Sequence, residues 1–261
     1  MPEASMELGI GTYCYMWSLA EGRMDAGALL ERASTLGVKR VQFGPNFPLA
    51  PGQADDVIRE ARRRSLTLEI GMAGLDTEEI RRQLELCRQA GAPLLRTVLA
   101  EEAGQAPPAE WIEQQLQAAV PWLEKARIPL ALENSVTPAV ELERLLRGPR
   151  LGATLDTANS LAICEGWRWV TEHLAPLTLC FHVKDFVVRR EWHRMGFRVE
   201  GRPAGRGQLD IPWILSKLGG RCQSAILELW PPELATIDET IEQEQSWVEE
   251  SIANLRRWIL K

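Results

Sequence analysis

The sequence is poor in the residues that disulfide-rich and multinuclear metal proteins depend on. It has three histidines and five cysteines, and the cysteines are scattered, odd in number and without a C-x-x-C pair. This usage is typical of free, mostly buried thiols in a reducing compartment, so we expect a cytoplasmic protein. Basic charge is not in excess either, because the net charge is −6 and the pI is near 5.3. An acidic chain argues against a nucleic-acid partner held by overall charge.

Long apolar runs are also missing. The N-terminus, MPEASMELGIG, lacks a basic stretch followed by an apolar one, and no apolar run of about 18 residues occurs in the chain. We therefore expect neither a signal peptide nor a membrane span. No linker or change in composition divides the sequence, which predicts one domain over residues 1–261.

Short apolar segments alternate with amphipathic helical patterns along the whole chain. The predicted strands begin near residues 8, 39, 66, 94, 128, 151, 178 and 224. Strictly alternating strands and helices imply parallel strands, and eight such units indicate an α/β protein with a (β/α)8 TIM barrel. A doubly wound open sheet is the alternative. It is disfavoured because the first strand–helix turn, GIGTYCYMW, has no G-x-G-x-x-G fingerprint.

Ionisable residues stand at the ends of four successive predicted strands. They are Glu133 in ALEN, Asp156 in TLDT, His182 in CFHVKD and Glu228 in ILEL. In a barrel these ends converge on one face, where three unpaired acids would repel one another unless a cation lay between them. One divalent metal ion resolves that conflict.

The predicted ligand set is mostly oxygen with a single nitrogen and no thiolate. It suits Mn²⁺ or Mg²⁺, with Co²⁺ and Zn²⁺ as alternatives. For any one of the four residues taken alone, a buried acid satisfied by a neighbouring Arg or Lys is the competing interpretation. Four such residues in register favour the metal site.

A long, basic segment follows the seventh predicted strand, from Val187 to Asp210. A long loop on a compact barrel is typical of a substrate-binding element, and its charge favours an anionic substrate group such as carboxylate or phosphate. A solvated loop that balances nearby acids is the alternative. The basic residues in the segment are Arg189, Arg190, His193, Arg194, Arg198, Arg202 and Arg206.

These motifs resemble the xylose isomerase-like TIM barrels, the sugar phosphate isomerase/epimerase superfamily, over essentially the whole chain. The resemblance rests on LALENS, TLDTANS, FHVKDF, PAGRGQLD and LELW. It implies that Glu133, Asp156, His182 and Glu228 bind one divalent metal, with the two glutamates flanking the substrate as acid and base. This chain departs from many relatives at the end of strand two, where it has Gln42 instead of Glu. It also departs from several keto-sugar epimerases in having Asn159 instead of His after the strand-six Asp.

The expected function is a metal-dependent isomerase or epimerase of a keto-sugar or sugar derivative that acts through an enediolate. Lys184 lies on the same side of its strand as His182 and is a candidate catalytic residue that neutralises oxyanion charge. A salt bridge to an acid of the site is its alternative role. The candidate substrate-binding residues are Trp17, Asn159, Arg189, His193, Arg198 and Trp230.

Two other functions stay open at this point. A metal-dependent lyase, either a decarboxylase or a dehydratase acting on an oxo sugar acid, would use the same enediolate. A non-catalytic sugar-binding subunit is disfavoured because pure binding does not need the paired acids Glu133 and Glu228. The expected partner in each case is a small sugar or sugar acid, and a homo-oligomer is an alternative to a monomer.

Overall fold

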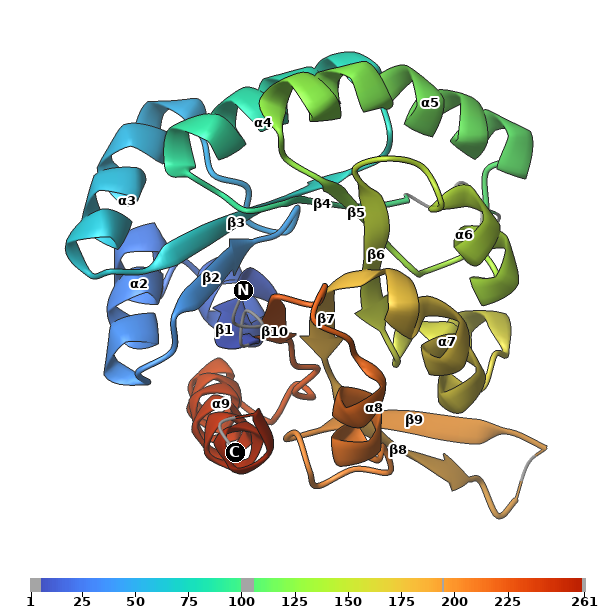
Figure 1. The fold of residues 1–261 in the computed structure, drawn as a ribbon. Coiled ribbons are helices and arrows are strands. Elements are labelled where there is room, and N and C mark those ends of the chain that lie inside the picture. The colour runs from blue at the N-terminus through green and yellow to red at the C-terminus, as the bar shows by residue number, and fades with distance from the viewer. Residues whose placement is uncertain (1–5, 100–105, 194, 260–261) are drawn as a thin grey trace.

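Eight parallel strands close into a barrel in the computed structural model, which describes residues 6–99, 106–193 and 195–259 (Figure 1). Each of the eight strands begins within two residues of its predicted position, which confirms the TIM barrel. Around the barrel the strands run in the order β1-β10-β7-β6-β5-β4-β3-β2. Their bounds are β1 Glu7–Gly11, β2 Arg40–Phe43, β3 Thr67–Ala73, β4 Leu95–Val98, β5 Leu130–Glu133, β6 Leu151–Asp156, β7 Thr178–Val183 and β10 Ser224–Leu227.

Helices surround the barrel and bury their apolar faces against it. Local sequence sets their ends: Asp76 accepts a hydrogen bond from the Glu79 backbone N–H at the start of α4, and Gly91 ends that helix with a φ of 70°. The helices are α1 Met16–Ala20, α2 Ala26–Thr35, α3 Pro51–Arg63, α4 Thr77–Ala90, α5 Ala109–Ala126, α6 Ala139–Leu145, α7 Trp167–Leu174, α8 Ile211–Lys217 and α9 Ile237–Ile259. Short 3₁₀ turns occupy Thr12–Tyr15, Asn159–Ile163 and Ala175–Leu177.

The segment predicted as a long loop after strand seven contains an antiparallel hairpin, which corrects that prediction. Strand β8 spans Asp185–Arg190 and pairs with β9, Phe197–Arg202. The hairpin extends outward from the ring of helices (Figure 1). Its sequence alternates apolar and charged residues in FRVEGR, the period of a strand with two different faces. The predicted start of the segment at Val187 therefore falls inside β8.

The helix α9 is tied to the first strand–helix connection by a buried carboxylate. Glu244 accepts hydrogen bonds from the backbone N–H groups of Trp17 and Ser18, at 2.8 and 3.1 Å, and from the Ser18 hydroxyl. This contact fixes the last helix across the seam where β1 meets β10. Among the helices of the described residues, none is both long enough and apolar enough to cross a membrane.

Candidate metal centre and active site

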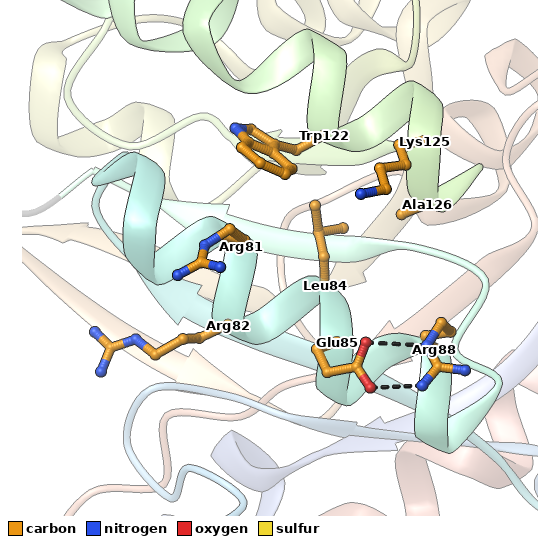
Figure 2. Close-up of a pocket in the computed structure, with 8 residues that line it drawn as sticks. All are labelled: Arg81, Arg82, Leu84, Glu85, Arg88, Trp122, Lys125 and Ala126. Atoms are coloured by element: carbon orange, nitrogen blue, oxygen red, sulfur yellow. Dashed lines mark hydrogen bonds and ion pairs between the residues drawn. The ribbon is translucent and has the colours of Figure 1, made fainter.

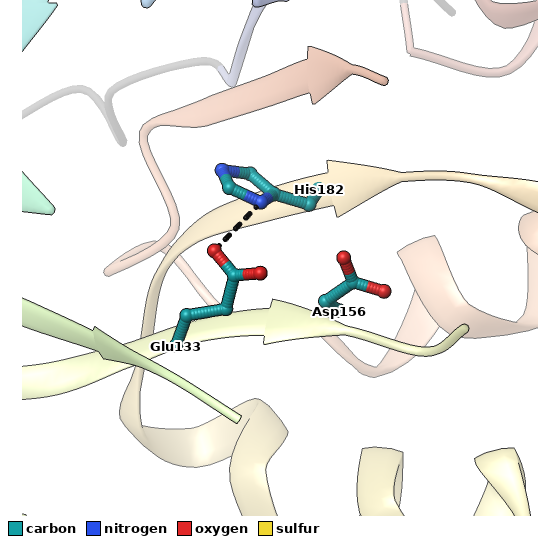
Figure 3. Close-up of side chains that lie close together, drawn as sticks. All are labelled: Glu133, Asp156 and His182. Atoms are coloured by element: carbon teal, nitrogen blue, oxygen red, sulfur yellow. Dashed lines mark ion pairs between the residues drawn. The ribbon is translucent and has the colours of Figure 1, made fainter. Parts of the chain in front are cut away.

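Three predicted metal ligands come together at the carboxyl ends of neighbouring strands. Glu133 and Asp156 end β5 and β6, and His182 is the penultimate residue of β7, directly opposite Asp156 in the sheet. One ligand atom from each of the three lies within 4.8 Å of the other two. Figure 3 shows the Glu133 carboxylate pointing at the His182 ring with Asp156 beside them. All three side chains are buried, as expected for a site at the active face of a TIM barrel.

The fourth predicted ligand, Glu228, lies beside this cluster. It follows β10 directly, and its Oε1 is 3.2 Å from His182 Nδ1, while Glu133 Oε2 is 3.0 Å from the same nitrogen. Burial opposes protonation of His182, but the negative charges of Glu228 and then Glu133 outweigh it and raise the pKa of the imidazole. The imidazole therefore stands between two carboxylates.

Donors hold both oxygens of the Glu133 carboxylate. Asn159 Nδ2 donates to Oε1 at 2.8 Å, and Arg96 Nε donates to Oε2 at 2.7 Å. Burial alone would raise the pKa of Glu133, but the Arg96 guanidinium, followed by His182, lowers it well below its ordinary range. Glu133 is thus a firmly stabilised anion.

The ammonium group of Lys184 completes the charge pattern. Its Nζ lies 2.6 Å from Asp156 Oδ2 and 2.9 Å from Glu228 Oε2. Burial disfavours the charged amine, but Asp156 and Glu228 outweigh it and raise the pKa of Lys184. The carboxyl of Asp156 has a raised pKa because its complete burial outweighs the attraction of Lys184. Lys184 therefore stays charged and makes the salt bridges that were the alternative to its catalytic role.

This donor set fits a divalent cation. Among the described residues, His182 Nδ1 finds no hydrogen-bond partner of good geometry, although it is buried between two carboxylate oxygens. A buried ring nitrogen facing several acids is the arrangement that a metal ion satisfies. Glu133, Asp156 and His182 form the group that can hold the ion, and Glu228 lies next to it.

Sequence comparison identifies the family of the chain. The profile described as "Xylose isomerase-like TIM barrel" matches residues 30–258. The chain belongs to the xylose isomerase-like TIM barrel family. Over 259 residues it is 26% identical to the 3-oxo-isoapionate decarboxylase of Pectobacterium atrosepticum, with 95% of this chain and 94% of that protein covered. The similarity to this decarboxylase thus spans nearly the full length of both proteins.

Two solved structures show how closely the barrel is shared. The D-psicose 3-epimerase of Clostridium cellulolyticum H10, solved with D-tagatose, has a TM-score of 0.73 at 13% identity and covers 98% of this chain and 100% of its own. A xylose isomerase-like TIM barrel protein of Mycobacterium smegmatis, in complex with magnesium, has a TM-score of 0.69 at 10% identity, with 98% and 99% covered. At these identities the likeness establishes the fold alone.

Two predicted substrate-binding residues line a cavity beside the cluster of Glu133, Asp156 and His182. The cavity has a volume of about 430 Å³, and Asn159 and Trp230 both border it. Asn159 also contacts Glu133, and the Trp230 ring centroid lies 4.9 Å from Lys184 Nζ. The remaining lining residues are small or apolar apart from one serine, namely Ser135, Ala158, Leu161, Ala162 and Val199.

The other candidate substrate-binding residues are not among those that line this cavity. Trp17 Nε1 donates to the Pro231 carbonyl at 3.0 Å. Arg189, His193 and Arg198 are exposed on the hairpin. Arg198 pairs there with Glu191 at 3.1 Å. The prediction for Arg194 lies outside the described residues.

Arg96 is the site residue that the sequence interpretation missed. It lies on β4 in LLRTV and is buried against Glu133 on the adjacent strand. Within the described residues its Nη1 has no hydrogen-bond partner. A charged residue inside an apolar strand was the signal, the same one that identified Glu133.

Asp185 has a structural role next to Lys184. Its carboxylate accepts backbone N–H groups from Phe186 at 2.9 Å, Gly205 and Gly207 at 2.8 Å, and Leu209 at 3.2 Å. These bonds fold the PAGRGQLD segment around the end of β7. Asp185 is therefore an anchor for this segment.

A second hollow, of about 510 Å³, lies on the outer surface between α4 and α5 (Figure 2). It is lined by Trp122, Lys125 and several arginines of α4. Arg81 and Arg88 pair with Glu78 and Glu85 three residues earlier in the same helix, at 2.7 and 2.6 Å. The hollow borders the middle and end of α4 and the last turn of α5, and both helices lead into the amino ends of strands, on the opposite side of the barrel from Glu133 and Asp156.

Proposed function

We propose that the protein is a divalent-metal-dependent lyase that releases the carboxylate of a 3-oxo sugar acid as CO₂. The observation that carries the proposal is the state of Glu133, whose two oxygens are held by Asn159 and Arg96. A carboxylate fixed in this way is a poor base. Isomerisation or epimerisation needs one group to remove a proton from carbon and another to return it, whereas decarboxylation needs only the second. The full-length similarity to 3-oxo-isoapionate decarboxylase supports the same reaction class.

The proposed cofactor is one ion of Mn²⁺ or Mg²⁺, with Co²⁺ and Zn²⁺ as alternatives, because the donors are mainly oxygen. Bound at Glu133, Asp156 and His182, with Glu228 adjacent, such an ion supplies positive charge that stabilises the oxygens of an enediolate. The protein groups determine where the substrate lies and how the proton moves.

In the proposed reaction the bond between the carboxylate carbon and C2 breaks, and its electron pair forms the enediolate across C2 and C3. CO₂ leaves, and one proton is added to C2. We assign that proton transfer to Glu228, which takes a proton from water and passes it to C2; its oxygens face His182 Nδ1 at 3.2 Å and Lys184 Nζ at 2.9 Å. Lys184, kept charged by its acidic neighbours, compensates the developing oxyanion.

The cavity beside the cluster is the proposed site for the remainder of the substrate. Asn159 reaches from Glu133 into this cavity, and the face of Trp230 suits the carbon skeleton of a sugar derivative. Arg189, His193 and Arg198, at the exposed hairpin, remain proposed contacts for a substrate anion. The buried free thiols of Cys14, Cys87, Cys180 and Cys222 support the proposed cytoplasmic location.

A keto-sugar isomerase or epimerase is the second candidate. It is favoured by the position of Glu133 and Glu228, which both approach His182 Nδ1, at 3.0 and 3.2 Å, so that two acids flank one centre. In that reaction Glu133 would have to exchange a proton with carbon despite its bonds to Arg96 and Asn159.

Two parallel incubations distinguish the proposed decarboxylase from the isomerase or epimerase. The protein loaded with Mn²⁺ is given 3-oxo-isoapionate in D₂O, and a parallel sample receives a keto-sugar without a carboxylate. We expect CO₂ release and one deuterium at the carbon that carried the carboxylate, with no deuterium in the keto-sugar. Deuterium in the recovered keto-sugar, without CO₂ from the acid, would establish isomerisation instead.

A further inference from the structure

A series of buried, hydrogen-bonded polar side chains on β2 and β3 leads to His182 of the candidate metal site. Arg40 and Gln42 lie on the same face of β2, and Gln42 is directly opposite Glu69 on β3. Arg40 Nη1 donates to Glu69 Oε1 at 3.0 Å, and Gln42 Nε2 donates to Glu69 Oε2 at 2.9 Å. Gln42 and Glu69 are almost completely buried. A polar chain of this kind inside a barrel is costly unless every member is paired.

The pairing fixes the direction of the Gln42 amide. An amide has a donor end and an acceptor end, and the Glu69 carboxylate, which already receives the Arg40 guanidinium, accepts the donor end. The acceptor end must then face the other way. There Gln42 Oε1 lies 2.7 Å from His182 Nε2.

An acceptor at this position decides which ring nitrogen of His182 carries the proton. Because Gln42 Oε1 has no hydrogen to give, Nε2 must be the donor of this bond. A neutral imidazole has one N–H, so its lone pair is then on Nδ1. That nitrogen is the one that faces Glu133 and Glu228.

We propose that Gln42 is a positioning residue that holds His182 in the Nε2–H tautomer with its Nδ1 lone pair directed at a divalent cation, and that Glu69 with Arg40 fixes Gln42 in that role. The inference rests on the metal site of the proposed function. It assigns a role to Gln42, the residue at the end of strand two where many relatives have Glu. The residue supports the ligand, as partners of metal-bound histidines generally do.

Nitrogen NMR tests the tautomer directly, since the chain has only three histidines. The full chain is labelled with ¹⁵N-histidine, stripped with a chelator and then loaded with diamagnetic Mg²⁺. We expect one imidazole, absent in His182→Gln, to show the Nε2–H tautomer in the wild-type protein. In Gln42→Met, which keeps the length of the side chain but removes the acceptor, that preference is lost. A wild-type His182 in the Nδ1–H tautomer overturns the proposal without any variant.

Metal affinity is the second measurement, with free Mn²⁺ counted by EPR. Loss of a ligand's supporting partner typically weakens binding by about 10–100-fold, and we expect a loss in that range for Gln42→Met. Cys180→Ala is the matched control. The Cys180 thiol lies in the same buried layer, 3.6 Å from Gln42 Nε2 and 3.8 Å from Glu69 Oε2, but the acceptor that faces His182 Nε2 is Gln42 Oε1. It should change the affinity by less than about twofold, well below the loss expected for a supporting partner.

A charge swap separates positioning from packing. In the double variant Gln42→Glu/Glu69→Gln, the new carboxylate accepts from His182 Nε2, and the new amide donates to it and accepts from Arg40. We expect this variant to recover the tautomer and most of the Mn²⁺ affinity. A folded double variant without the Nε2–H tautomer, or a folded Gln42→Met with unchanged tautomer and affinity, would overturn the proposal. Absence of Mn²⁺ binding in the wild type would instead reject the proposed function, because the tautomer can still be measured in the metal-free protein at a pH above the raised pKa of His182.

Discussion

Arg96 Nε donates to Glu133 Oε2 across 2.7 Å, and both residues are almost fully buried, Arg96 within β4 and Glu133 at the carboxyl end of β5. With Lys184, this arginine gives two cations against three buried acids, Glu133, Asp156 and Glu228, so the protein side chains leave one net negative charge when His182 is neutral. A divalent cation changes that balance to one net positive charge. A site with this balance attracts an anionic substrate, which is consistent with the proposed sugar acid.

Removing the guanidinium tests the ion pair. Arg96→Met leaves the buried Glu133 carboxylate without its main counterion, and breaking such a pair costs about 3–5 kcal/mol. We expect the free energy of unfolding of the metal-free protein, measured in urea, to fall by about that amount. Saturating Mn²⁺ should recover part of the loss, because the ion replaces the missing charge.

The matched control is Arg81→Met. Arg81 forms an ion pair with Glu78 at 2.7 Å on the exposed face of α4, where such pairs contribute about 0–1 kcal/mol. If the two variants lost similar stability, Arg96 would not be the counterion on which Glu133 depends.

Metal binding should tighten as the pH rises. Burial opposes protonation of His182, but the charges of Glu228 and Glu133 outweigh it and raise the pKa of the imidazole. In the folded metal-free protein His182 therefore keeps its proton to a higher pH than it does in the unfolded chain. Protonated His182 therefore stabilises the metal-free fold below its unfolded pKa of about 6.5, and this contribution is lost as the pH rises through the raised folded pKa. A metal ligand must be unprotonated, so Mn²⁺ competes with that proton.

We expect the logarithm of the Mn²⁺ association constant, measured by EPR from pH 6 upward, to rise by up to about one per pH unit and then level off above the raised pKa. In His182→Gln the slope should vanish along with most of the affinity. An affinity in the wild type that does not change with pH would show that His182 gives up no proton on metal binding.

Replacement of Glu228 by glutamine removes the proposed proton donor while keeping the shape of the side chain. Glu228→Gln should lower the rate of CO₂ release by about 10²–10⁴-fold, the usual contribution of general acid–base catalysis. Its Mn²⁺ affinity should be partly preserved because Glu133, Asp156 and His182 form the cluster without it. Near-normal turnover would remove Glu228 from the mechanism.

The fold could be predicted in detail because alternating apolar segments and helical patterns leave few arrangements for this chain. The polar residues at the predicted strand ends also indicated the site, because Glu133, Asp156 and His182 lie close together in the structure. Arg96 and Glu69 were not expected at the site, and Gln42 was noted only as a departure from Glu at the end of strand two. Their partners lie on other strands, and only the closed barrel makes them neighbours.

The hairpin was harder to foresee for a different reason. Its exposed residues, including Trp192 and Phe197, do not form a buried face, so the hydrophobic pattern gave a weak strand signal. The anchoring of Asp185 depends on backbone N–H groups of a segment about 20 residues later, which no local pattern reports.

Gly207 offers a test of that anchor. A β-carbon at this position would overlap the Asp185 carboxylate and the Phe186 carbonyl oxygen. Gly207→Ala should therefore push Asp185 away from the backbone N–H groups of Gly205 and Leu209 and displace the neighbouring Lys184 from Asp156. We expect a loss of about 1–3 kcal/mol of stability in urea, typical of overpacking, and a fall in the rate of CO₂ release.

Gly196→Ala is the control for that variant, since a β-carbon there meets no atom within 4 Å. It lies next to β9 in the same hairpin but makes no contact with Asp185, so its stability should stay within about 0.5 kcal/mol of the wild type. Because Lys184 acts through charge at the reacting oxygens, Gly207→Ala should lower kcat more than it raises KM. A Gly207→Ala variant that loses stability but keeps kcat would show that Asp185 anchors the segment without placing Lys184.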